Sequence, residues 1–282
     1  MRQGESAARE PLLDGGRSHQ GGSESLRRSP PQWKKWVSML PLLYILEVAF
    51  IVALTVWRAE DGVLNDAQAW SIYALAIVMS AYFLLASLLG YWGVYTRAKT
   101  QEAYIALWLP FVPVVIALVW FAASADLRVA LARVVDGTAD GTLRMGDQKW
   151  FIALQGLRVL ALGSIIKERL GLFPFWFAYL TALPDFLFGL SAWILLAAFG
   201  PSDATCATAL AVWHLVGFVV IVPFSMIVLQ SGLPGVFRIH SPKPGNELIY
   251  EFPMSLGPSI VVPIFVMYNL LCAWRLLVAQ QA

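Results

Sequence analysis

Long apolar stretches separated by short polar segments run through most of this chain. A helix needs about 20 apolar residues to cross the hydrocarbon core of a bilayer. Seven stretches meet or approach that length: 36–57, 70–94, 103–124, 150–167, 173–198, 207–230 and 254–277. The pattern predicts an all-α, polytopic transmembrane helical bundle of about seven spans. The fourth stretch is the shortest and most polar, so the sequence leaves open whether it crosses fully.

Residues 1–35 have a different character from the rest of the chain. They are rich in Gly, Ser, Arg and Glu and contain no apolar run, which is typical of disordered segments. The first long apolar stretch begins only at about Trp36, so no signal peptide is expected. The sequence therefore predicts a disordered cytoplasmic tail over 1–35 and a seven-span transmembrane domain over 36–278.

Positive charge sets the expected orientation, because cytoplasmic loops of membrane proteins are enriched in Lys and Arg. Basic residues precede the first span and occupy the second, fourth and sixth connections, whereas the first, third and fifth connections are acidic or balanced. The basic positions are Arg27, Arg28, Lys34, Lys35, Arg97, Lys99, Lys167, Arg169, Arg238 and Lys243. We therefore expect the N-terminus in the cytoplasm and the C-terminus outside.

The composition agrees with a membrane protein and excludes other classes. Hydrophobic residues make up 59% of the chain and charged residues 13%, about half the charged share of a soluble domain. The mean hydropathy is +0.66. A net charge of +2, with no basic stripe, gives no indication of a nucleic-acid partner. The lipid bilayer is the expected partner; the sequence distinguishes neither plasma membrane from endomembrane nor one oligomeric state from another.

Three charged side chains fall near the middle of predicted spans. Each costs roughly 2.5–3.5 kcal/mol on insertion scales and so needs an explanation. Glu47 is central in the first span, Arg158 in the fourth and Asp185 in the fifth, and alternating span directions place all three near the midplane. In one interpretation Arg158 pairs with one carboxylate, and the other holds a proton or cation or acts as a general acid. In the alternative, Arg158 and Asp185 form a structural bridge and Glu47 is neutral or hydrogen-bonded.

Further polar residues extend this set of candidates. Gln155 lies three residues before Arg158 and so on the same helical face. His214, in the outer half of the sixth span, could join a proton path or bind haem, although we favour a hydrogen-bonded packing role. No zinc, nucleotide-binding or nucleophile motif is present, so neither a metal nor a cofactor is expected. The segment 128–135 predicts a short basic amphipathic helix on the membrane surface.

Four groups of residues from about residue 150 onward carry a family resemblance. They are Gln155 with 158–163, then 174–178, then Asp185 with Gly189 and Ala192, and finally 253–258 with 262–263. With these residues the chain resembles an uncharacterised family of small bacterial-type multi-pass membrane proteins. The resemblance implies that Arg158 and Asp185 belong to one motif, and it brings no activity. A histidine is usual in that family where this chain has Tyr268 or Asn269.

Three functions fit these features. The first is proton- or cation-coupled transport of a small solute, favoured by midplane charges and proline-broken spans. The second is an intramembrane enzyme acting on a lipid or isoprenoid, with Glu47 or Asp185 as general acid. The third is a non-catalytic membrane scaffold or sensor whose buried charges hold the bundle together. We favour transport over an enzymatic activity, and the sequence leaves the choice between them open.

Overall fold

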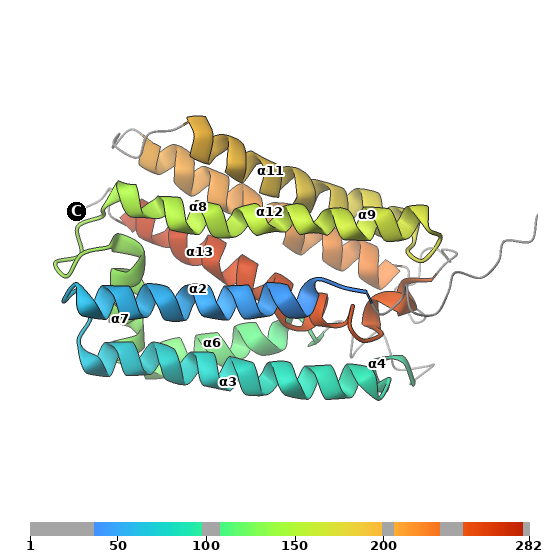
Figure 1. Cartoon of the computed structure of the whole chain (residues 1–282), viewed down its shortest axis with the longest axis horizontal. Helices are drawn as coiled ribbons and strands as arrows, with labels where there is room; N and C mark the ends of the chain where they lie inside the picture. The colour runs from blue at the N-terminus through green and yellow to red at the C-terminus, as the bar shows by residue number, and fades with distance from the viewer. Residues whose placement is uncertain (1–36, 98–107, 199–205, 232–244, 279–282) are drawn as a thin grey trace, which may run out of the picture.

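The computed structural model describes residues 37–97, 108–198, 206–231 and 245–278 of the chain. Every regular element in these ranges is a helix, and together they form an elongated bundle (Figure 1). Six helical stretches are long and apolar enough to cross a membrane, and a bent pair of helices makes a seventh if it is counted as one span. The predicted all-α membrane bundle is therefore confirmed. The tail predicted over 1–35 lies outside the described residues.

The first two long helices, α2 (Leu40–Glu60) and α3 (Asp66–Tyr91), form an antiparallel hairpin. A proline in the first turn starts α2. The side chain of Asn65 and that of Gln68 close a capping box that starts α3 four residues before the predicted residue 70. Gly93, with a φ of 67°, follows the end of α3 and separates it from the single turn α4 (Val94–Arg97).

The third predicted span, 103–124, ends at a sharp bend. Helix α6 (Phe111–Ala123) has 13 residues, and α7 (Ala125–Asp136) leaves it at 108°. Ser124 stands between them, and its Oγ accepts a hydrogen bond from the backbone N–H of Leu127, which caps α7. At 1.5 Å per residue α6 is only about 20 Å long. Residues 103–107 of the predicted span lie outside the described residues.

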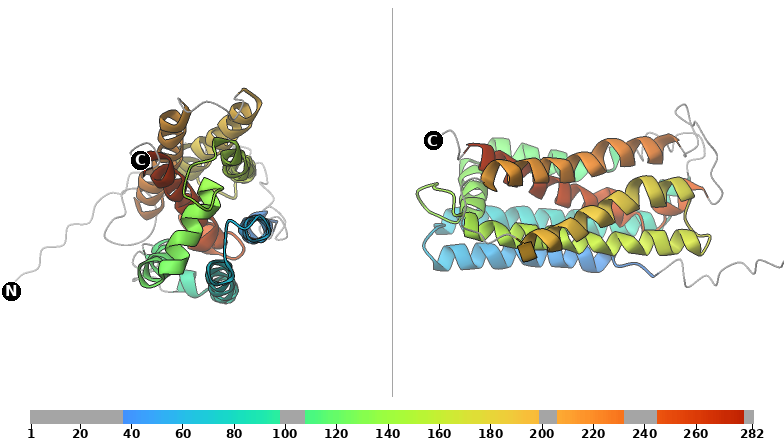
Figure 2. Two further views of the ribbon diagram at one scale, coloured as in Figure 1. Left: turned by 90° about the vertical axis from the view of Figure 1, so that its left-hand side faces the viewer. Right: turned by 90° about the horizontal axis from the view of Figure 1, so that it is seen from above.

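Helix α7 lies across one end of the bundle (Figure 2, left). The basic amphipathic helix predicted over 128–135 is present, but its apolar face packs on protein, chiefly α3, and not on a membrane surface. Four side chains of that face are completely buried: Leu127, Ala130, Val134 and Val135. The amphipathic pattern was the right sign of a helix, but the pattern alone could not say which apolar surface would cover it.

The second half of the chain supplies the remaining long helices. The fourth stretch is continuous from Met145 to Arg169 and is apolar enough to cross, although it is the stretch that the sequence left open. It consists of η1 (Met145–Asp147), α8 (Gln148–Gly156), the tight 3₁₀ turn η2 (Leu157–Ala161) and α9 (Leu162–Arg169). The later elements are α10 (Phe175–Phe177), η3 (Ala178–Ala182), α11 (Leu183–Ala198), α12 (Cys206–Ser231), η4 (Asn246–Tyr250), η5 (Gly257–Val261) and α13 (Val262–Val278).

Successive long stretches run in alternating directions, with α6 as one of them. The described chain enters the bundle at one end, at the start of α2, and leaves it at the other, at the end of α13 (Figures 1 and 2). An odd number of passes requires this arrangement. The geometry therefore agrees with seven passes in which the third is shortened and bent.

The fifth and seventh stretches share a backbone irregularity that the sequence did not predict. Each contains one five-residue π-helical segment, η3 or η5, and each has a proline two residues beyond that segment, Pro184 or Pro263. A Phe-Pro pair precedes both segments, so that Pro184 follows Pro174 by the same ten residues that separate Pro263 from Pro253. Proline removes a backbone donor, and π turns loosen the helix locally. Both helices are therefore interrupted at equivalent positions.

Small residues let the fourth and fifth stretches approach closely. A Cβ on Gly189 of α11 would lie 2.5 Å from the backbone N of Val159 and 3.1 Å from the Cβ of Arg158. The stretch that carries Arg158 therefore packs directly on the backbone of α11, and only glycine fits at that contact.

Gly189→Ala should destabilise the protein by about 1–3 kcal/mol, because the added methyl group must push η2 away from α11. Gly163→Ala is the matched control: it makes the same change in helix α9, where an added Cβ would have no neighbour within 4 Å. That control should be neutral or stabilising by up to about 1 kcal/mol. Thermal unfolding of both variants in detergent measures the difference, and equal midpoints would contradict this packing.

Candidate functional site

Arg158 is the centre of a polar network in the middle of the bundle. It lies in η2, and its side chain is 1% exposed. Its Nη1 donates to Gln155 Oε1 at 3.2 Å, and its Nη2 donates to the backbone oxygen of Gly217 at 3.3 Å. Its guanidinium carbon stands 4.2 Å from the centre of the Phe188 ring. These contacts join α8, α11 and α12 through one side chain.

Asp185 neutralises the charge of Arg158. Its Oδ1 accepts a charge-assisted hydrogen bond from Arg158 Nε. Asp185 stands in the first turn of α11, directly after Pro184 and the π-helical segment η3. Its side chain is 20% exposed, in contrast to its buried partner. The ion pair is therefore open to its surroundings only on the carboxylate side.

A chain of amide groups connects Arg158 to His214 of the sixth stretch. Gln155 Oε1 accepts a second hydrogen bond, from Asn269 Nδ2 at 3.3 Å, and Asn269 Oδ1 lies 2.9 Å from His214 Nδ1. Gln155, His214 and Asn269 are all completely buried. Polar groups buried in this way require partners, which explains why they gather around one another. The network therefore spans the fourth to the seventh stretches.

Gly217 leaves room for this arrangement. A Cβ on that residue would collide with the Phe188 ring and would lie 2.9 Å from Asn269 Nδ2. The Phe188 ring in turn stacks on Trp213, with ring centres 4.5 Å apart. The polar network is thus enclosed by aromatic rings on the side of α11 and α12.

Glu47 is buried but belongs to a different part of the interior. It shares the inward face of α2 with Leu43, Tyr44, Leu54, Thr55 and Arg58. Its exposure is 0%, and neither carboxyl oxygen has a hydrogen-bond partner among the described residues. The hydroxyl group of Tyr268 donates to the backbone oxygen of Glu47 at 3.3 Å and leaves the carboxyl group untouched. Glu47 is therefore a buried acid without a countercharge.

The structure thus brings four of the five predicted site residues into one network and leaves Glu47 outside it. The four are Gln155, Arg158, Asp185 and, through Asn269, His214. The sequence analysis had named Asn269 only as a position where the resembled family usually has a histidine, and it missed the role of Asn269 as the connecting residue. A buried amide facing a buried histidine has no signature in spacing, because the two residues lie on different helices.

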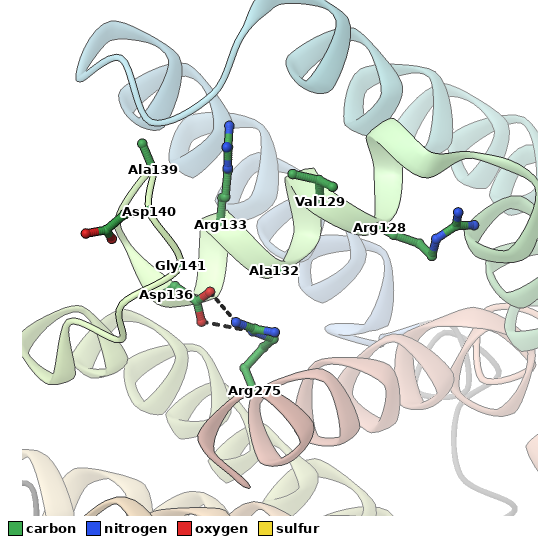
Figure 3. A pocket seen from close by; sticks show the side chains of 9 residues that line it. All are labelled: Arg128, Val129, Ala132, Arg133, Asp136, Ala139, Asp140, Gly141 and Arg275. Carbon is green, nitrogen blue, oxygen red and sulfur yellow. Dashed lines mark hydrogen bonds and ion pairs between the residues drawn. The ribbon is translucent and has the colours of Figure 1, made fainter. Parts of the chain in front are cut away.

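The sequence also missed two ion pairs beneath α7. Arg275 of α13 meets Asp136 with two hydrogen bonds, Nε to Oδ1 at 3.0 Å and Nη2 to Oδ2 at 2.6 Å (Figure 3). Arg58 Nη2 lies 2.8 Å from Asp147 Oδ2, and the Arg58 side chain is completely buried. The first pair fastens the C-terminal end of α7 to α13, and the second joins α2 to η1, which follows α7 in the chain. They lock the helix across the end of the bundle.

A pocket of about 290 Å³ opens on the outer side of α7 next to this lock, lined by residues that include three arginines. Its arginines do not converge on one point (Figure 3). Arg128 donates to the carbonyl groups that end α6, Arg133 donates to Gln68, and Arg275 is held by Asp136. No group of three or more potential metal-binding side chains occurs in the part of the chain that the structure describes. The central network is therefore the better candidate site.

Residues 109–277 match a protein family described as Domain of unknown function (DUF8737). The match covers more than half of the chain and includes the whole central network, α6 and α7. It agrees with the predicted membership of an uncharacterised family, and the bacterial origin in that prediction stays untested. The chain matches no curated protein and no solved structure.

Proposed function

The chain belongs to the DUF8737 family, whose description names no activity, and we propose that it carries out proton-coupled transport of a small solute. Glu47 is the proton-carrying group in this proposal. One observation supports this proposal above the others. Glu47 is completely enclosed, and neither of its carboxyl oxygens has a partner in the part of the chain that the structure describes. An unpaired carboxylate is costly in such surroundings, whereas a carboxylic acid is tolerated. Glu47 would therefore hold a proton in this conformation and release it when water reaches it.

The second buried acid has a different role in this proposal. Asp185 is paired with Arg158, and the pair is charge-neutral. A carboxylate held this way keeps its neighbouring helices in register and is not free to carry a proton. Coupling to a metal cation is less well supported, because cations of that kind require several oxygen ligands. A proton needs only one carboxyl oxygen, which Glu47 provides.

The interrupted helices also favour transport. In secondary transporters the substrate site lies near the midplane beside discontinuous helices, and one bundle rocks against the other. Here the interruptions of the fifth and seventh stretches occur at equivalent positions, each a π-helical segment followed by a proline. Asp185 directly follows one of them. A rigid scaffold has no need for paired interruptions of this kind.

An intramembrane enzyme on a lipid or isoprenoid is less well supported. Its general acid would have to be protonated and in contact with the substrate. Asp185 is the more accessible of the two acids, but its pairing with Arg158 favours the ionised form. Glu47 lacks such a countercharge, but it is completely enclosed.

The test is solute-driven proton movement in lipid vesicles that contain the purified protein and a pH-sensitive dye. A panel of neutral, anionic and cationic solutes is added outside, and the solute that drives proton uptake identifies the substrate class. Glu47→Gln should lower that flux by roughly 10²-fold or more, as loss of a proton-transferring group does. Glu60→Gln is the matched control: it makes the same change at the exposed end of the same helix.

The control variant should transport protons at the wild-type rate. If Glu47→Gln also keeps that rate, Glu47 is not the proton carrier. If no solute in the panel moves protons with wild-type protein, proton-coupled transport of these solutes is rejected.

A further inference from the structure

The hydrogen bonds of the central network have a fixed direction that starts at Arg158. A guanidinium group can only donate. The Gln155 side-chain atom that faces Arg158 Nη1 at 3.2 Å must therefore be the oxygen, Oε1. The usual ambiguity of an amide side chain, in which oxygen and nitrogen exchange places, is removed here by chemistry.

The orientation of the Gln155 amide also fixes the orientation of the next amide, Asn269. Because the oxygen of Gln155 accepts at 3.3 Å from Asn269, the Asn269 atom at that contact must be Nδ2. The other Asn269 atom is then Oδ1, which lies 2.9 Å from His214 Nδ1. An amide oxygen can only accept, so Nδ1 of His214 must carry a proton. The charge of Arg158 thereby fixes the tautomer of a histidine on a different helix.

This tautomer leaves the second ring nitrogen of His214 as an acceptor. A neutral imidazole protonated on Nδ1 has a bare lone pair on Nε2. His214 is completely buried, and its Nε2 has no partner among the described residues. Gln155 Nε2, at the other end of the chain of amides, is a buried donor that is likewise without a partner there. The network therefore leaves one acceptor, His214 Nε2, to which a hydroxyl group can donate.

We propose that His214 Nε2 is a binding site for a neutral hydroxyl group, supplied either by a buried water molecule or by the transported solute. A cation is the poorer match, because the network already contains the guanidinium charge of Arg158, and Asp185 neutralises only that one charge. If the hydroxyl group belongs to the solute, the substrate class is a neutral hydroxylated molecule. That last step rests on the proposed transport function, whereas the tautomer and its acceptor do not.

Nitrogen NMR of His214 in lipid bilayers tests both parts without measuring transport. His19→Gln and His240→Gln leave His214 as the single histidine, and the protein is labelled with ¹⁵N-histidine. The expected spectrum shows a protonated Nδ1 and a bare Nε2. Asn269→Leu removes the acceptor and should shift the tautomer toward Nε2–H. A wild-type spectrum with Nε2–H overturns the proposal, whether or not the Asn269→Leu variant folds.

The source of the hydroxyl group is found with two further measurements on the same sample. Magnetisation transfer from water to Nε2 identifies a buried water molecule. A change of the Nε2 signal on addition of glycerol, but not of trimethylamine N-oxide, which accepts hydrogen bonds without donating them, identifies a solute hydroxyl group. If neither water nor glycerol affects Nε2, no hydroxyl group binds there and the proposal is wrong. Absence of proton flux in vesicles would reject transport and leave the tautomer result standing.

Discussion

Asp185→Asn should destabilise the bundle by about 3–5 kcal/mol, because it leaves the buried charge of Arg158 without its carboxylate. Arg158→Gln should cost a similar amount, since it leaves the Asp185 carboxylate without its guanidinium partner. The double variant should be milder than either single one, because it removes both charges together. Unfolding in detergent by a denaturant measures all three variants and yields the coupling energy of the pair.

The double variant also separates the competing functions. If Arg158 and Asp185 only hold the helices together, the double variant should recover the solute-driven proton flux along with its stability. If the pair also orients the network for transport, the double variant is stable but its solute-driven proton flux stays low. Additive destabilisation by the two single changes would contradict the direct pairing seen here.

Asp136→Asn should have the second large effect on stability, about 3 kcal/mol or more, because the Arg275 guanidinium then loses a buried carboxylate with two hydrogen bonds. Asp140→Asn is the matched control. That carboxylate is exposed, and hydrogen bonds from Thr142 lower its pKa. Exposed substitutions of this kind change stability by about 0.5 kcal/mol or less. Thermal unfolding compares the two variants, and equal losses would contradict the lock on α7.

Loss of the ion pair between Asp136 and Arg275 should also have a local effect on α7. Hydrogen exchange of the backbone amides in α7 should rise selectively in Asp136→Asn, since the helix depends on its ion pairs to stay across the bundle end. Protection in α12, which supplies no residue to the pair of Asp136 and Arg275, should change only with the global stability. Uniform loss of protection throughout the bundle would show that α7 is not held separately.

Hydrophobic patterning predicted the helices well because a bilayer imposes one length and one polarity on every span. The features that it did not predict depend on contacts of single side chains. The start of α3 depends on the capping box of Asn65, and the break in the third stretch depends on Ser124, which caps α7. Both are side-chain to backbone contacts that a hydropathy average cannot register. The 3₁₀ and π-helical segments were not predicted, because a hydropathy average cannot register them either.

The predicted site residues were those whose charge is costly inside a membrane, and that argument led to Arg158 and Asp185. It did not lead to Asp136, Asp147 or Arg275, because charges near span ends look like ordinary loop charges. Asp136 reaches the interior because α7 lies across the end of the bundle, whereas the sequence analysis placed 128–135 on a membrane surface. The family match begins at residue 109 and not near 150, so it includes this bent segment as well.

The central claim is that Glu47, alone among the buried acids, carries the proton. Infrared difference spectra of the protein in lipid bilayers between neutral and alkaline pH test it most directly, because a protonated carboxyl group has its own carbonyl absorption. We expect a protonated carboxyl band at neutral pH that is lost in Glu47→Gln and kept in Asp185→Asn and Glu60→Gln. A band that survives Glu47→Gln and disappears in Asp185→Asn would contradict the account.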